Sequence, residues 1–186
     1  MKNIILASSS PRRHMLMREA GIPFTVETED TDETCEGLPE ERVRILAERK
    51  ARAIAKRHTA GIVLGADTLV SLHDEAFGKP ADDGEASRML HALSGNTHQV
   101  YTGVCVIDCA TGRCLVRSAR SDITFRTLTD EEIAAYIATG EPAGKAGAYA
   151  IQQKGGALVA GWSGPYDNIV GLPMDVVRAL LEEIGC

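Results

Sequence analysis

Residues 62–70, with the sequence IVLGADTLV, form the apolar run that decides the fold. Its branched apolar residues favour a β-strand, but the polar group Gly65-Ala66-Asp67-Thr68 interrupts the run where a buried strand would prefer branched apolar side chains. The pattern places the Asp67 carboxylate near the end of a strand. In α/β proteins a cleft commonly lies at such a position.

Helical and extended patterns alternate on both sides of this run. Before it, residues 3–7 predict a strand, Pro11 opens a helix, and the apolar positions of residues 39–54 fall on one face of a long helix. After it, residues 99–108 and 114–125 predict a long hairpin. Strands joined by both hairpins and helices indicate a mixed sheet.

The other predicted elements are shorter. They are a strand at residues 24–27, an acidic loop at 29–36, a helix at 86–93, a helix opened by the capping box of Thr129 and Glu132, extended segments at 146–152 and 158–162, and a last helix from Pro173. We therefore expect an α/β fold in which a mixed, twisted sheet with flanking helices forms two lobes around a cleft. The whole chain, residues 1–186, is expected to be one domain.

Composition and charge narrow the classes of function. The net charge of −6 argues against binding to DNA or RNA, because neutralising phosphates needs a broad basic surface. No apolar run approaches the roughly 20 residues of a membrane span, and the N-terminal run has no features of a signal peptide. We expect a cytoplasmic protein that does not bind membranes.

The five cysteines do not suggest a disulfide framework. Their number is odd, there is no CxxC pair, and no histidine that could serve as a ligand lies near Cys105, Cys109 and Cys114. Reduced thiols are the favoured interpretation, with a structural zinc site as the alternative. A cysteine-phosphatase mechanism is not favoured, because the Cys-x5-Arg spacing from Cys114 to Arg120 falls inside a predicted strand of the hairpin and not in a loop.

The segment Ser8-Ser9-Ser10-Pro11-Arg12-Arg13 lies between a predicted strand and a predicted helix. Hydroxyls, free N–H groups at a helix start and two guanidiniums all donate towards anionic oxygen, which suits a polyphosphate. A serine cap followed by a helix-starting proline and two solvated arginines explains the same residues without any ligand. The motif alone leaves both interpretations open.

Several charged residues are ambiguous in the same way. Asp67 fits either a metal ligand or water-activating base, or an aspartate that caps a turn. Lys50 and Lys79 fit either phosphate contacts or solvated surface charges. Glu33 fits either a second metal ligand beside Asp67 or part of an acidic rim. The amide of Gln152 fits either recognition of a base edge or a polar position after a tightly packed strand. The five histidines are scattered without ligand spacing, and none is assigned a role.

Seven ordered motifs together resemble the Maf family of nucleotide pyrophosphatases. They are SSSPRR, GADT, GKP, LSGNTHQVYTG, FRTLT, GE before KAGAYAIQ, and NIVGLP, and they span nearly the whole chain. The resemblance implies a Maf/ITPase-like α/β fold with a deep cleft. It also implies a hydrolase that needs a divalent cation, Mg²⁺ or Mn²⁺, and cleaves nucleoside triphosphates between the α and β phosphates; a homodimer is possible.

The resemblance assigns roles residue by residue. Asp67 of GADT becomes the proton acceptor that activates water, and Glu33 helps Asp67 to bind the metal. The triphosphate and its leaving group would be held by Ser10, Arg12, Arg13, Lys79 and Lys50.

The chain resembles the branch of the family that acts on dTTP and UTP. This resemblance depends on Arg12, Thr68 and Gln152, which it implies are the specificity residues. Modified pyrimidine nucleotides are further candidate substrates, in a house-cleaning role. The alternatives are a 7-methyl-GTP pyrophosphatase, an enzyme for modified purines, and a nucleotide-binding regulator of septum formation without turnover. The chain departs from the family pattern at Gly144, usually Asp, at Ala150, usually Gly, and at Pro165, usually Ser.

Overall fold

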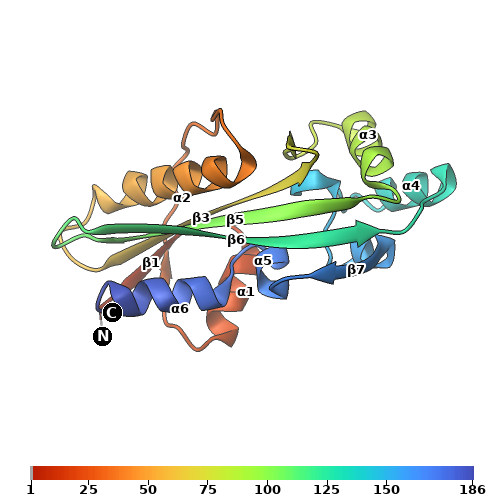
Figure 1. Cartoon of the computed structure of the whole chain (residues 1–186). Coiled ribbons are helices and arrows are strands. Elements are labelled where there is room, and N and C mark those ends of the chain that lie inside the picture. Colours follow the sequence, from red (N-terminus) through yellow and green to blue (C-terminus); the bar gives the residue numbers. More distant parts are fainter. Residues whose placement is uncertain (1) are drawn as a thin grey trace.

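The computed structural model describes residues 2–186 as a long twisted sheet with helices on both faces (Figure 1). The strands are β1 Ile4–Ala7, β2 Thr25–Val26, β3 Ile62–Leu72, β4 Glu75–Phe77, β5 Thr97–Asp108, β6 Cys114–Phe125 and β7 Val159–Ser163. The α-helices are α1 Pro11–Glu19, α2 Pro39–Ala55, α3 Asp83–Leu93, α4 Asp130–Ile137, α5 Tyr166–Val170 and α6 Met174–Glu183. Two 3-10 turns, η1 Ala146–Ala148 and η2 Lys154–Leu158, precede β7.

The sheet is mixed, with the order β2-β1-β3-β5-β6-β7, and β4 pairs with the end of β3. β1 runs parallel to β2 and to β3, whereas every other pair is antiparallel. β3, β5 and β6 are the longest strands and form the spine of the molecule. The prediction of a mixed α/β sheet with flanking helices is confirmed.

Helix α2 lies very close to the sheet because two glycines face it. A Cβ on Gly65 would lie 2.4 Å from the Ala47 carbonyl oxygen, and a Cβ on Gly103 would lie 2.2 Å from the Val43 carbonyl oxygen. Any side chain at either position would push the helix away, since real Cβ contacts are never this short. The small residues in β3 and β5 therefore fix the distance between α2 and the sheet.

The remaining helices divide into two groups. Helices α1, α5 and α6 lie on the face opposite α2, and α3 and α4 lie at the far end of the sheet (Figure 1). One core cluster joins α1 and α6 to β1, β3 and β5, and a second joins α3 and α4 to the distal halves of β5 and β6. A third cluster lies between α2 and the strands β1, β3 and β5.

Two predictions about local structure are wrong. Asp67 lies in the middle of β3 and not near its end, because the strand continues unbroken through Gly65-Ala66-Asp67-Thr68. Residues 146–152 are not extended; they contain η1 and turns, in which Gly147 and Ala148 have φ values of 68° and 63°. The positive φ at Gly147 lets the backbone approach Val70, whose methyl groups would lie 2.9 Å from an added Cβ.

Across residues 2–186, we find no helix with the length and apolar composition needed to cross a membrane. All five cysteines are free thiols, as the favoured interpretation predicts. Cys105 and Cys114 face one another across β5 and β6 with 3.6 Å between their sulfur atoms. No group of three or more metal-ligating side chains occurs in the part of the chain that the structure describes.

Candidate active site

A cleft of about 950 Å³ opens beside the middle of β3. On this edge of β3, pairing with β1 ends at Gly65 and pairing with β4 begins at Val70. Within the described range 2–186, the four residues between them have no strand partner on that side. The sheet therefore has a gap, and the cleft occupies it.

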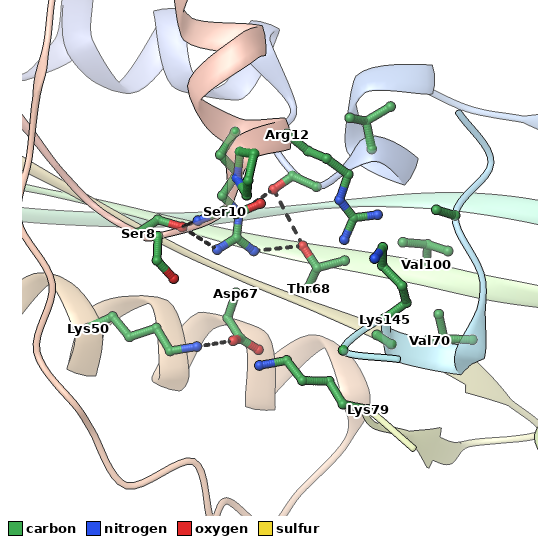
Figure 2. A pocket seen from close by; sticks show the side chains of 18 of the residues that line it. Ser8, Ser10, Arg12, Lys50, Asp67, Thr68, Val70, Lys79, Val100 and Lys145 are labelled. Carbon is green, nitrogen blue, oxygen red and sulfur yellow. Dashed lines mark hydrogen bonds and ion pairs between the residues drawn. The ribbon is translucent and has the colours of Figure 1, made fainter. Parts of the chain in front are cut away.

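Both faces of β3 contribute to the cleft because side chains alternate along a strand. Asp67 turns towards α2, where it meets Lys50, whereas Thr68 turns towards α1 and the segment after α5. Two neighbouring residues of the GADT motif thus serve opposite sides of the same opening. Figure 2 shows these side chains around the cleft.

Lys50 stands between the two carboxylates that the sequence predicts as metal ligands. Its Nζ donates to Asp67 Oδ1 at 2.6 Å and lies 2.9 Å from Glu33 Oε1. The hydrogen bond from Lys50 is the main cause that lowers the pKa of Glu33. Because Lys50 lies on α2, the close approach of this helix at Gly65 and Gly103 is what brings the ammonium to Asp67.

Arg13 is tied into the protein by most of its donors. Its Nε donates to the Gly171 carbonyl at 2.8 Å, one terminal nitrogen donates to Ser8 Oγ and the Ala66 carbonyl, and the other donates to Thr68 Oγ1. Four of the five N–H groups of a guanidinium are thus used. Burial lowers the pKa of Arg13, and the charge of Asp67 opposes that shift. Arg13 can therefore offer a triphosphate at most one N–H group.

Other cations of the cleft are free to bind a ligand. Within residues 2–186, neither Arg12 nor Lys79 has a side-chain hydrogen bond or ion pair with a protein group, although both line the cleft. Figure 2 shows the Lys79 ammonium beside Asp67, and the Arg12 and Lys145 side chains pointing into the hollow further along, beyond Thr68. Burial lowers the pKa of the Arg12 guanidinium, as expected for a cation that awaits an anionic partner.

The start of α1 forms the wall beside these cations. Ser10 is the N-cap residue and Pro11 opens the helix, but the Ser10 side chain makes no capping hydrogen bond. The Ser10 N–H donates to Ser8 Oγ at 3.3 Å, and the Ser10 hydroxyl stays available at the cleft. A helix start with free donors attracts anions.

The opposite end of the cleft is apolar. It is lined by Val70, Val100, Tyr149, Ile151 and Ile169, with the exposed Gln152 at its rim. A cleft with one cationic end and one apolar end suits a charged group attached to a flat ring. Of these residues, the sequence prediction assigned a role only to Gln152, because apolar side chains that line a cleft are indistinguishable in sequence from ordinary core residues.

The predicted site residues therefore come together in one place. Each of them lines the cleft: Ser10, Arg12, Arg13, Glu33, Lys50, Asp67, Thr68, Lys79 and Gln152. The position that departs from the family pattern, Gly144, lines it as well; it has a φ of 71°, and nothing lies within 4 Å of an added Cβ. Lys145 and Gly171 are cleft residues that the sequence did not single out for a role in the site.

Asp67 and Glu33 also fit a divalent cation by their chemistry. Both carboxylates contact the same ammonium, so they already surround a site that attracts positive charge. Two carboxylates supplemented by substrate phosphates are a typical set of oxygen ligands for Mg²⁺.

Fold and site together define a hydrolase of polyphosphate substrates: a mixed α/β sheet opens at a central aspartate that is surrounded by lysines and arginines. The chain belongs to the Maf family, since the sequence model of the Maf-like proteins matches residues 3–184.

The sequence and the fold both have known relatives. The chain is 49% identical over 187 residues to a dTTP/UTP pyrophosphatase from Moorella thermoacetica, covering 100% of this chain and 96% of the relative. It is 46% identical to a dTTP/UTP pyrophosphatase from Pelotomaculum thermopropionicum, covering 100% and 98%. The fold is similar to a HAM1 protein from Coxiella burnetii, with a TM-score of 0.58, 17% identity, and coverage of 98% of this chain and 100% of that one.

Proposed function

We propose that this chain hydrolyses dTTP and UTP to the nucleoside monophosphate and pyrophosphate, with Asp67 as the base. The observation that carries the proposal is the position of Asp67: it lies between Lys50 and Lys79, in a cleft that Arg12 also lines and that has an apolar end. The names of the Moorella and Pelotomaculum relatives support the choice of dTTP and UTP.

In this mechanism the triphosphate lies at the cationic end and the pyrimidine at the apolar end. A carboxylate oxygen of Asp67 accepts a proton from a water molecule while the water oxygen bonds to the α-phosphorus. The bond from that phosphorus to the bridging oxygen breaks, and pyrophosphate leaves. Arg12 and Lys79 stabilise the charge that develops on the leaving group, and the Ser10 hydroxyl orients it.

A divalent cation, Mg²⁺ or Mn²⁺, belongs to the same proposal, with Asp67 and Glu33 as its protein ligands. When bound, it would supply positive charge to the phosphate oxygens and lower the pKa of water. Lys50 holds the two carboxylates in position in its absence and turns to the triphosphate when the nucleotide binds. A cytoplasmic setting is also proposed, and the five free thiols support it.

The test is pyrophosphate release from dTTP, UTP, CTP, GTP and 7-methyl-GTP, each with Mg²⁺ or Mn²⁺, beside the Asp67→Asn variant. We expect fast release from dTTP and UTP, and a loss of about 100-fold or more in the variant that keeps nucleotide binding. Preference for 7-methyl-GTP or a modified purine would replace the pyrimidine assignment. Binding without release in the wild type would favour a regulator of septum formation over an enzyme, and a modified pyrimidine that outcompetes dTTP would identify a house-cleaning role.

A further inference from the structure

Thr102 lies directly beneath the cleft without lining it. It is on β5 opposite Thr68 of β3, and none of its surface is exposed. Its hydroxyl donates to the Asn168 carbonyl at 3.1 Å and lies 3.0 Å from Thr68 Oγ1. Thr102 therefore touches Thr68, which lines the cleft, and Asn168, which precedes a lining segment, while a bound nucleotide cannot touch Thr102.

The direction of these hydrogen bonds follows from the chemistry of their ends. A carbonyl oxygen only accepts, so the Thr102 hydrogen is used on Asn168 and Thr102 Oγ1 must accept from Thr68. An arginine only donates, so Thr68 Oγ1 accepts from Arg13 at 3.0 Å. The result is a one-way chain from Arg13 through Thr68 and Thr102 to the Asn168 carbonyl.

The alternative arrangement is weaker. Thr68 Oγ1 also lies 3.4 Å from the Gly171 carbonyl, but that carbonyl already accepts from Arg13 Nε at 2.8 Å. If Thr68 donated to it, that carbonyl would accept a second and longer hydrogen bond, and the 3.0 Å hydrogen bond from Thr68 to the buried Thr102 hydroxyl would be lost. The hydroxyl of Thr102 thus decides which way Thr68 points.

This series of hydrogen bonds ends at Asn168, next to the segment that lines the apolar part of the cleft. Asn168 is fully buried, and its side-chain amide donates to the Val100 carbonyl and to Ser121 Oγ at 3.0 and 2.9 Å. The three residues after it, Ile169, Val170 and Gly171, line the cleft. This accounts for the asparagine of the NIVGLP motif: it anchors the wall to β5 and β6, and Thr102 anchors its backbone.

We propose that Thr102 is a positioning residue for the apolar, ring-binding end of the cleft, acting through Thr68 and Asn168. The proposal rests on the proposed function in that its main readout is hydrolysis of dTTP. Without the hydroxyl, Thr68 turns to Gly171, the Asn168 carbonyl is released, and the wall from Ile169 to Gly171 shifts. Asp67, on the other side of β3, keeps its contact with Lys50. Nucleotide binding and selectivity should therefore change more than the chemical step.

The experiment compares Thr102→Val, which keeps the shape without the hydroxyl, with Thr102→Ser, which keeps the hydroxyl. Thr97→Val is the matched control, because Thr97 is on the same strand and, among residues 2–186, its hydroxyl bonds only to Thr124, at 2.7 Å. We expect Thr102→Val to raise KM for dTTP about tenfold with kcat within about threefold, and to reduce the preference for dTTP over GTP. Thr102→Ser and Thr97→Val should stay within about twofold of the wild type.

Several results would overturn the inference. A Thr102→Val enzyme with unchanged KM and preference would do so, as would a Thr102→Ser enzyme as impaired as Thr102→Val, or a fall in kcat alone. The double variant with Thr68→Val should be no worse than either single variant, whereas additive losses would show that the two threonines act separately. If Thr102→Val does not fold, Thr68→Val is expected to show the same rise in KM. A normal KM in Thr68→Val would contradict the proposed series of hydrogen bonds.

Failure of the proposed function has a different signature. In that case the wild type releases no pyrophosphate from any nucleotide, and calorimetric binding of dTTP replaces kinetics. An approximately tenfold weaker Kd in Thr102→Val, restored in Thr102→Ser, would still support the inference. Equal affinities of the wild type and Thr102→Val for dTTP, or no binding of dTTP by any of the proteins, would contradict the inference.

Discussion

The ammonium of Lys50 lies 2.6 Å from Asp67 Oδ1 and thereby stands where a cation shared by Asp67 and Glu33 would be attracted. A lysine in this place holds two neighbouring carboxylates close together, because its positive charge offsets their mutual repulsion. It also competes with any metal ion for the same oxygens.

Replacing Lys50 by methionine should separate these two effects. In the absence of nucleotide, Lys50→Met is expected to bind Mn²⁺ more tightly than the wild type, because the competing ammonium is gone and the carboxylate pair needs a cation. Pyrophosphate release should nevertheless fall, since the proposed contact of Lys50 with the triphosphate is lost. Calorimetric titration with Mn²⁺ measures the first effect, and weaker Mn²⁺ binding in the variant would contradict it.

Glu33→Gln tests the second carboxylate. The variant should need about tenfold more Mg²⁺ for half-maximal activity, because one of the two proposed protein ligands becomes a neutral amide. The matched control is Glu36→Gln in the same acidic loop, whose side chain is exposed and does not line the cleft. Identical Mg²⁺ curves for Glu33→Gln and the wild type would exclude Glu33 as a ligand.

Gly103→Ala should be strongly destabilising although it adds only a methyl group. The new carbon would lie 2.2 Å from the Val43 carbonyl oxygen, so α2 or β5 must move, at a cost of about 2 kcal/mol or more. Since α2 carries Lys50, activity should also fall in the fraction that stays folded. Gly161→Ala on β7 is the control: nothing lies within 4 Å of its added carbon, and a change within about 0.5 kcal/mol is expected by urea unfolding.

His98 makes stability depend on pH. Burial lowers its pKa to about 4, and the neutral ring bonds to the Tyr149 hydroxyl at 2.8 Å. The unfolded chain takes up a proton near the ordinary value of 6.5, so stability is lost as pH falls from about 6.5 towards 4.

For this one group the loss between pH 7 and pH 5 is roughly 2 kcal/mol. His98→Phe, which keeps an aromatic ring beside Phe125 and Tyr149, should lose less over that interval. Chemical unfolding of both proteins at the two pH values measures the difference. Equal losses would show that His98 does not titrate as its burial requires.

Much of the fold was predictable because it depends on local signals. The long amphipathic helix, the hairpin of β5 and β6 and the capping box at Thr129 follow from periodicity and turn chemistry, and the structure confirms them. Residues 146–152 were mispredicted because small residues carry little periodicity. Their conformation depends on Gly147 fitting against Val70, a contact between distant parts of the chain.

The site was predictable as a set of charges but not as an arrangement. The sequence indicated both Arg12 and Arg13 as ligands of the triphosphate, yet the structure leaves Arg12 free and ties Arg13 to four acceptors. That difference depends on the Ala66 and Gly171 carbonyls, and no sequence pattern identifies which backbone oxygens meet a given side chain. The sequence did not indicate Thr102 for the same reason, because its contact with Thr68 depends on the register between β3 and β5.

The gap beside β3 has a consequence for the behaviour of the protein in a crowded cell. An open strand edge invites strands from other chains and is a common start of aggregation. The outer strands of this sheet, β2 and β7, have two and five residues, and in the described part of the chain β7 pairs only with Asp122–Phe125 of β6. Its inner open edge is only a few residues long, is bounded by β1 and β4, and has Arg13 bonded to the Ala66 carbonyl. The opening admits a small molecule but is too short and too enclosed for another chain to add a strand.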